Sequence, residues 1–150
     1  MSLLASSANA KIKVSSTLNK DVKNFGKQFL TDGSNETCWN SEAGPNQWII
    51  VDFVQPVSLT QVGLMFQGGF SAAQVHVFHT STSPLPAASP DWIPLTTVYP
   101  TDSNAPQSFD LASGLSSECI RSLKVVFADA SDTYGRIILY GFDLYGQVVE

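Results

Sequence analysis

Hydrophobic residues along the chain recur mainly at every second position, in short runs that polar turns separate. This period is typical of β-strands, and no stretch shows the longer amphipathic pattern of a full helix. Residues 49–53, preceded by Trp48, indicate a short buried strand, whereas residues 19–30 allow at most one turn of helix. The predicted strands are residues 11–16, 49–53, 57–66, 74–78, 92–99, 108–111, 123–127 and 136–145, with a break at Gln55 and Pro56.

Clusters of Gly, Pro, Asn and Asp lie between these runs and supply the backbone angles that tight turns need. About eight short strands joined by such turns predict an all-β fold, an antiparallel β-sandwich or jelly roll. The proline-rich residues 83–90 are interpreted as a long surface loop, because the segments on either side are too small to be separate domains. One domain is therefore expected over residues 1–150, of which residues 1–3 could be a remnant of cloning.

Composition and charge narrow the classes of partner. With 43% hydrophobic and 14% charged residues, the chain is too apolar for a disordered segment. Its 8 basic and 13 acidic residues give a formal charge of -5, which argues against direct binding of nucleic acid or of anionic membranes. No apolar run reaches the ~20 residues of a membrane span, and the N-terminus lacks the basic region of a signal peptide.

The sequence contains no nucleophile elbow, P-loop, dinucleotide fingerprint or zinc-protease motif. His76 and His79 are the only histidines, and at a spacing of three in a strand they point to opposite faces and cannot share a metal ion. We therefore expect a protein that is not an enzyme. Cys38 and Cys119 belong to no C-x-x-C pair, and two free thiols in a reducing compartment are expected, with a bridge between them as the alternative.

Three segments carry a specific family pattern. Residues 30–39, LTDGSNETCW, precede residues 47–53, QWIIVDF, and residues 135–146 read GRIILYGFDLYG. This combination resembles discoidin-type domains, the coagulation factor 5/8 type C family with galactose-binding-like folds, over nearly the whole chain. The resemblance implies a jelly-roll β-sandwich. From the residues themselves, Asp32 and Gly33 suit a tight turn in which the carboxylate caps backbone amides and glycine takes a positive φ. Trp39 and Trp48 are interpreted as core aromatics.

Further motifs are similar to an intracellular branch of this family that associates with nuclear receptors. They are VSSTLN at 14–19, FGK at 25–27, TCWNS at 37–41, FQGGFS at 66–71 and FADASD at 127–132. The resemblance implies a protein-interaction module whose partner is a protein, with a nuclear receptor as the candidate. Such a module would act as a transcriptional adaptor or repressor in the cytoplasm and nucleus. The lack of cysteines near the two ends fits this branch, because secreted members usually bridge cysteines there.

The resemblance also implies a possible calcium-binding site. Sugar-binding members hold Ca²⁺ beneath the first loop with carbonyls, the Asp of the D-G turn and a Glu near the closing strand. Asp32 matches the first carboxylate and the carbonyls of Asn35 and Thr37 could contribute oxygens, but Gly141 stands where the Glu would align. Ca²⁺ binds best with six to eight oxygen ligands, several of them charged. No cofactor is required on this interpretation, and calcium is possible only at an incomplete site.

A carbohydrate-binding function is the alternative. Sugar-binding members of the family use loops at one end of the sandwich, where this chain would place Asn40, Phe70, Tyr134 and Arg136. An aromatic ring that stacks on a sugar, with Arg and Asn donating to hydroxyls, is the chemistry of such a site. The same residues could instead only fill gaps between the loops. Lipid binding through Phe25 and Phe70 is a weaker hypothesis, because the acidic chain lacks a basic rim.

Arg136 follows a loop that contains Asp129 and Asp132. As an interface residue it would contact a ligand or partner, since Arg is enriched at binding hot spots. As a structural residue it would bridge its own loop to the D-G turn and organise carboxylates that otherwise repel each other. The second role is favoured, because a single Arg among aspartates has local partners available.

Overall fold

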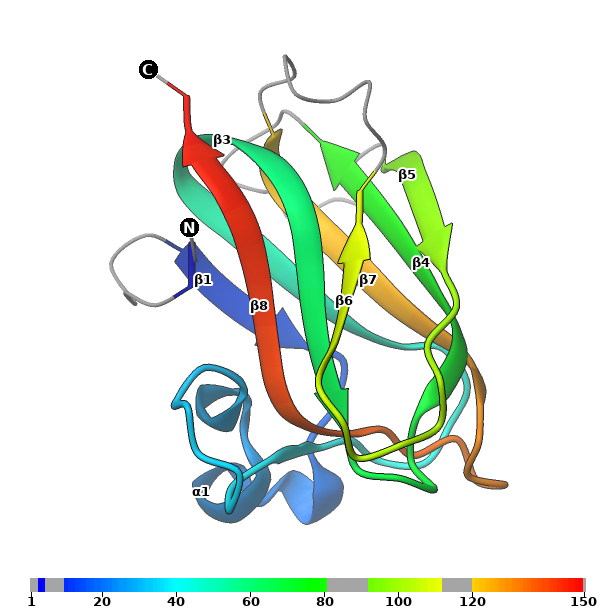
Figure 1. Cartoon of the computed structure of the whole chain (residues 1–150). Helices are drawn as coiled ribbons and strands as arrows, with labels where there is room; N and C mark the ends of the chain where they lie inside the picture. The colour runs from blue at the N-terminus through cyan, green and yellow to red at the C-terminus, as the bar shows by residue number, and fades with distance from the viewer. Residues whose placement is uncertain (1–2, 5–9, 81–91, 112–119, 150) are drawn as a thin grey trace.

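The computed structural model describes residues 3–4, 10–80, 92–111 and 120–149 as a two-layered antiparallel β-sandwich (Figure 1). The surface loop predicted at residues 83–90 and Cys119 lie outside the described residues. The described strands are β1 (Ala10–Val14), β2 (Trp39–Asn40), β3 (Gln47–Phe66), β4 (Ala72–Thr80), β5 (Ile93–Val98), β6 (Gln107–Asp110), β7 (Ile120–Ala130) and β8 (Ile138–Val148).

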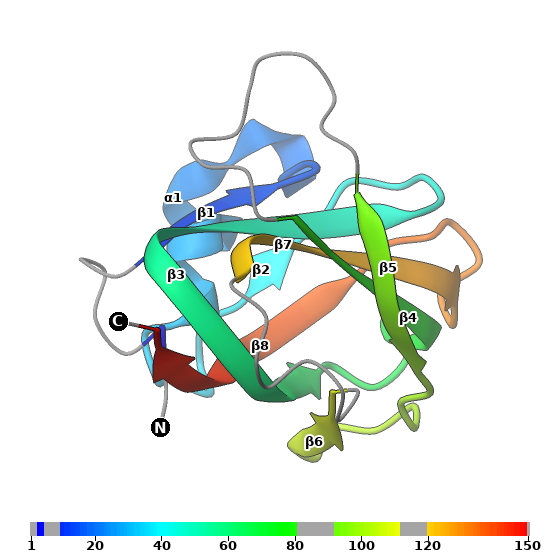
Figure 2. The ribbon, with the colours of Figure 1, turned by 90° about the horizontal axis from the view of Figure 1, so that it is seen from above.

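Strand β3 belongs to both layers. Its first half pairs with β1 and β7, and β7 continues the sheet to β4 and β5. Its second half pairs with β8 and β6, and β8 in turn pairs with β2. Figure 2 shows β3 turning a corner between the two layers. The all-β jelly-roll sandwich predicted from the sequence is therefore confirmed.

The corner of β3 lies where the sequence predicted a break between two strands. The pairing register with β7 shifts between Asp52 and Val57, and Val54 at the corner is 57% exposed. Pro56 has no N–H to donate, so it fits a position at which the ladder is interrupted. The prediction of two separate strands is therefore wrong, but the predicted position of the interruption matches the bend in β3. One strand can leave a sheet by bending and continue in another.

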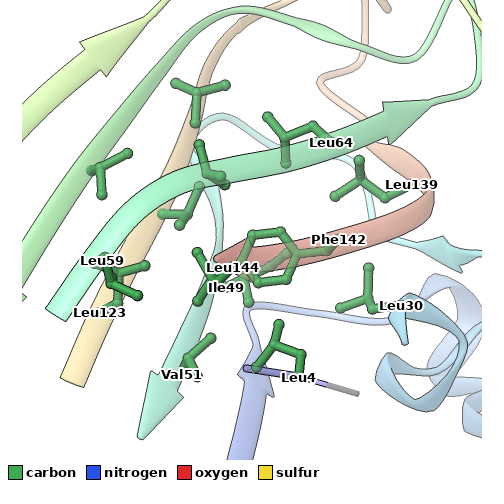
Figure 3. Close-up of a cluster of buried hydrophobic side chains, with 14 of the residues drawn as sticks. Leu4, Leu30, Ile49, Val51, Leu59, Leu64, Leu123, Leu139, Phe142 and Leu144 are labelled. Carbon is green, nitrogen blue, oxygen red and sulfur yellow. The ribbon is translucent and has the colours of Figure 1, made fainter. Parts of the chain in front are cut away.

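The two layers enclose one apolar core. Inward residues of β3, β7 and β8 pack together, and Figure 3 shows part of this cluster, with Leu30 and Leu4 closing one side. Phe127 lies at its centre, 6.2 Å from the ring of Trp39 and edge-on to Phe66 at 6.0 Å between ring centroids. Leu3, one of the residues 1–3 that the sequence left open as a remnant of cloning, is 2% exposed, and its N–H donates to Leu144 O.

A short helical segment joins β1 to β2. It contains the 3-10 turns Leu18–Lys20 and Lys27–Leu30 on either side of α1 (Val22–Phe25), close to the single helical turn that the sequence allows. The side chain of Asp21 caps α1 by accepting from Asn24 N at 3.2 Å. No described helix is long and apolar enough to cross a lipid bilayer.

The faces of the strands show where the two tryptophans and the two histidines point. Trp39 is fully buried in β2, a strand of two residues that the periodicity missed because two residues give no pattern. Trp48 is only partly buried and lies on the outer face of β3, so its interpretation as a core residue is wrong. His79 is buried and His76 is partly exposed on the other face of β4, which confirms their opposite directions.

Candidate functional site

Four loops meet at one end of the sandwich, drawn at the bottom of Figure 1. We call this region the loop end and define it as residues 41–46, 67–71, 101–106 and 131–137. Polar side chains join the loops to one another. Asp102 accepts hydrogen bonds from Gly69 N at 2.8 Å and from Ser71 Oγ at 2.9 Å, and Asn104 accepts from Gly68 N at 2.7 Å. These bonds preorganise the loops before any ligand arrives.

The last of the four loops is tied to its neighbours through its backbone. Gly44 N donates to Tyr134 O at 2.8 Å, and Ser131 N donates to Ser71 O at 2.9 Å. Gly135 has a φ of +84°, and a Cβ at this position would lie 2.5 Å from Gly44 O. Only glycine fits both this backbone angle and this close approach.

Arg136 is the centre of the side-chain cluster at the loop end. Its Nε donates to Asp132 Oδ2 at 3.0 Å and its Nη2 donates to Asp132 Oδ1 at 3.3 Å, a bidentate pair. The guanidinium carbon also lies 5.2 Å from the centre of the Phe70 ring and 5.8 Å from that of Tyr134. Both distances suit cation–π contacts.

The ion pair changes the acidity of its members. The hydrogen bond from Arg136 lowers the pKa of the Asp132 carboxyl, and the same bond raises the pKa of the guanidinium. Arg136 N also donates to Asp132 Oδ2 at 3.0 Å, so that carboxylate fixes both the backbone and the side chain. The charge of Arg136 is thus partly neutralised within its own loop.

The predicted loop residues divide into two groups. Phe70, Tyr134 and Arg136 come together, and Tyr134 is 67% exposed. Asn40 is 9% exposed in β2, and its buried amide oxygen has no hydrogen-bond partner among the described residues. The predicted link from Arg136 to its own loop is present through Asp132, whereas among the described contacts its guanidinium makes no hydrogen bond to the D-G turn.

Sequence reasoning did not single out Asp102 or Asn104. Both lie in residues 101–106, which the sequence marked only as a turn-forming cluster. Asp and Asn are frequent in turns because their side chains accept from nearby backbone amides. The sequence gives no sign that these two instead accept from a loop more than thirty residues away.

The D-G turn forms as the sequence predicts. Asp32 Oδ1 accepts from Ser34 N at 3.0 Å, its other oxygen accepts from the Thr37 hydroxyl, and Gly33 has a φ of +73°. Both carboxylate oxygens are therefore used within the turn. Among the described residues, no three His, Cys, Asp or Glu side chains gather closely enough to hold a metal ion. This donor set does not fit the several charged ligands that calcium favours.

Cys38, at the end of this turn, is half-buried, and burial raises the pKa of its thiol. Its thiol is free among the described residues, and the predicted state of Cys119 stays a prediction.

A cleft with a volume of about 410 Å³ lies beside the D-G turn and reaches Pro106 at the edge of the loop end. Its walls include Gly33 and Asn35 of the turn, and Gly63 and Gly141 of the neighbouring strands β3 and β8. At Gly141 an added Cβ would meet only Met65 Cβ at 3.9 Å. The absence of side chains at these glycines helps to hollow this outer surface of the β8–β3–β6 sheet.

Comparisons with known proteins agree with this architecture. The sequence model of the F5/8 type C domain matches residues 11–138. The chain belongs to the F5/8 type C domain family. Among solved structures, chitosan-binding module 1 of a chitosanase/glucanase from Paenibacillus sp. IK-5 superposes with a TM-score of 0.74 at 22% identity, covering 95% of this chain and 98% of that one. A Clostridium perfringens module, CpGH89CBM32-5, in complex with GalNAc-β-1,3-galactose gives 0.74 at 15% identity, over 97% and 100% of the two chains. At these low sequence identities, the structural similarity establishes the shared fold and nothing about the ligand.

Several relatives of this F5/8 type C domain share one name, nuclear receptor 2C2-associated protein. The Xenopus tropicalis protein is 42% identical over 136 residues, which is 89% of this chain and 91% of that protein. The Danio rerio protein is 39% identical over 135 residues, covering 90% and 89%. The Homo sapiens protein is 35% identical over 137 residues, covering 91% of both.

Proposed function

We propose that this F5/8 type C domain is a non-catalytic protein-interaction module that associates with a nuclear receptor, as a transcriptional adaptor or repressor in the cytoplasm and nucleus. The observation that carries the proposal is the similarity to nuclear receptor 2C2-associated proteins over about nine-tenths of both chains. The region shared with this chain therefore makes up most of each of those relatives.

The loop end is the proposed contact surface. Tyr134 and Arg136 belong to the residue types that dominate binding energy in protein interfaces, and Phe70 adds a second ring. Asp102 and Asn104 hold the loop of Phe70, and hydrogen bonds between Ser71 and Ser131 join that loop to the one that carries Tyr134 and Arg136. Loops that are already ordered lose less conformational entropy on binding, which favours affinity.

The test uses the purified full chain and purified nuclear receptor 2C2 in isothermal titration calorimetry. Tyr134→Ala should weaken binding about tenfold or more, because Tyr134 is 67% exposed and free to enter a partner pocket. Tyr99→Ala is the matched control, since Tyr99 is 69% exposed but follows β5 outside the cluster. Absence of binding by the wild-type chain would contradict the receptor partner. Equal losses in both variants would contradict the loop end as the contact surface.

Sugar binding by the same loops is the second candidate function. The observation in its favour is that solved structures with this fold include modules described as chitosan-binding or bound to GalNAc-β-1,3-galactose. Arg136 between two aromatic rings could donate to hydroxyls while a ring stacks on the sugar face. Galactose and chitotriose titrations monitored by amide NMR shifts distinguish the two functions. Shifts confined to residues 67–71 and 131–137 would favour sugar binding, and unchanged spectra would remove it.

A further inference from the structure

The outer face of the sheet β1–β3–β7–β4–β5 carries apolar side chains where a solvent-facing sheet normally carries polar ones. Trp48 and Ile50 of β3, Val126 of β7 and Phe78 of β4 are all partly exposed on this face. Their strand neighbours, which point the other way, are buried in the core. These strands are therefore apolar on both faces.

The strand register places these side chains next to each other. Trp48 and Ile50 lie directly opposite Val126 and Lys124 of β7, which in turn lie opposite His76 and Phe78 of β4. Lys124 Nζ sits 5.5 Å from the centre of the Trp48 ring. The six residues form a grid of two rows across three strands, and Lys13 of β1 extends the row of Ile50. We call this grid, with Lys13, the Trp48 face.

Strands that are apolar on both faces are typical of sheets with a layer packed on each side, whereas half-solvated antiparallel strands alternate. The core supplies the inner layer here. The sequence already shows the feature in the unbroken run WIIV at residues 48–51, which the sandwich core explains only at Ile49 and Val51.

The charge of this face is opposite to that of the whole chain. Its charged members are Lys13 and Lys124, and the adjoining row of the sheet carries Lys11 directly opposite Asp52. The chain overall carries 8 basic and 13 acidic residues. Positive charge around an apolar centre complements a partner that presents apolar side chains with acidic ones around them.

The dimensions suit a helix. Strands in a sheet lie about 4.8 Å apart, so the row from Lys13 through Ile50 and Lys124 to Phe78 spans about 15 Å. A helix rises ~1.5 Å per residue, so about ten residues would cover this row. The partly exposed indole of Trp48 and the ring of Phe78 are the groups that would enter between the apolar side chains of such a helix.

We propose that the Trp48 face is a docking surface for an acidic amphipathic helix of a partner protein. This surface lies on a sheet face, involves none of the loop-end residues, and does not depend on the function proposed for that end. Leucine-type side chains of the helix would cover Trp48, Ile50 and Phe78, and its acidic residues would approach Lys13 and Lys124.

The test titrates the ¹⁵N-labelled full chain with a synthetic peptide of about 18 residues that carries leucine on one helical face and glutamate on the other. Amide shifts should concentrate at β3, β4 and β7, and affinity should fall with added salt. Lys13→Glu should weaken binding about three- to tenfold. Lys23→Glu is the matched control, because Lys23 is equally an exposed lysine but lies on α1. A peptide of the same composition with its leucines scattered should bind more weakly.

Three results would overturn the proposal. No shifts at millimolar peptide would exclude this class of partner, and equal effects of Lys13→Glu and Lys23→Glu would reduce the binding to general charge attraction. Tighter binding of a thymidine oligonucleotide than of the peptide at the same residues would assign the face to single-stranded nucleic acid instead. Lys13 and Lys23 are exposed, so neither substitution changes a core residue. Thermal melting of the wild type and of both variants checks that all three are folded.

Discussion

The two halves of β3 face solvent in different ways although they belong to one strand. In the second half, buried Val62 and Leu64 alternate with Gln61 and Gly63, which is the pattern of a sheet with one solvated face. In the first half, both Ile49 on the inside and Ile50 on the outside are aliphatic. The sandwich core therefore accounts for the apolar residues of the second half except Met65, but for only part of those of the first half.

The largest expected effect separates the inner and outer positions of the first half. Ile49 is fully buried, and Ile49→Ala should lower the free energy of unfolding by about 2–5 kcal/mol, because a cavity remains in a close-packed core. Ile50→Ala should cost about 1 kcal/mol, because its side chain stays partly in water. Urea denaturation of both variants measures the difference. If the two changes cost the same, the outer face is already covered within the chain, and it is not a docking surface.

The second prediction concerns glycines that pack against the second half of β3. A Cβ on Gly146 would lie 2.0 Å from the backbone oxygen of Ser58, whereas a Cβ on Gly141 would only touch Met65 at 3.9 Å. Gly146→Ala should therefore destabilise the chain by about 1–3 kcal/mol through forced backbone shifts, while Gly141→Ala stays within about 0.5 kcal/mol. Differential scanning calorimetry compares the two. A large loss for Gly141→Ala would show that the outer surface of this half is packed rather than open.

Most of the fold follows from the sequence, because its strands are long enough to show their period. β7 extends three residues beyond each end of the predicted 123–127, whereas β8 begins two residues after and ends three residues after the predicted 136–145. Strand ends are hard to predict because alternation fades next to turn residues. β2 was not predicted, because a strand of two residues shows no alternation. Trp48 was misplaced because a run apolar at every position does not tell which face is the inner one.

The loop end was predictable only in part. Phe70, Tyr134 and Arg136 were anticipated from the family resemblance, and the structure brings them together. The pairing of Arg136 with Asp132 followed from their proximity in sequence. The supports from Asp102 and Asn104 join loops that are distant along the chain, and no local pattern encodes such contacts.

The third prediction compares a positive charge at the loop end with one on the Trp48 face. Arg136 is paired with the carboxylate of Asp132, whereas Lys124 lies over the ring of Trp48. Arg136 holds the pKa of the Asp132 carboxyl below its usual value. Since the folded-state pKa is the lower one, the stabilisation is present above the unfolded pKa of about 3.9 and is lost as the pH falls through the folded value. Arg136→Ala should lower the melting temperature at neutral pH by about 2 °C, in the range of a solvent-exposed ion pair.

Melting curves between neutral and acidic pH distinguish the cause. The difference between wild type and Arg136→Ala should shrink once Asp132 is protonated, and Lys124→Ala, on the Trp48 face, should show no such change in this pH range. An unchanged melting temperature for Arg136→Ala at neutral pH would defeat its structural role. It would then leave Arg136 available as a contact residue only.

The smallest expected effect concerns calcium at the D-G turn, next to the open second half of β3. Asp32 and the exposed Glu36 are the carboxylates of the turn, and the two oxygens of Asp32 already accept from Ser34 N and from the Thr37 hydroxyl. Calcium would have to displace these bonds and would gain no second carboxylate at Gly141, so we expect millimolar Ca²⁺ to shift the melting temperature by less than about 1 °C relative to EDTA. Asp32→Ala should lower the melting temperature equally in both buffers, because it removes the turn bonds and not a metal ligand. A calcium-dependent rise in wild type that Asp32→Ala abolishes would show instead that the turn binds the ion and rearranges to do so.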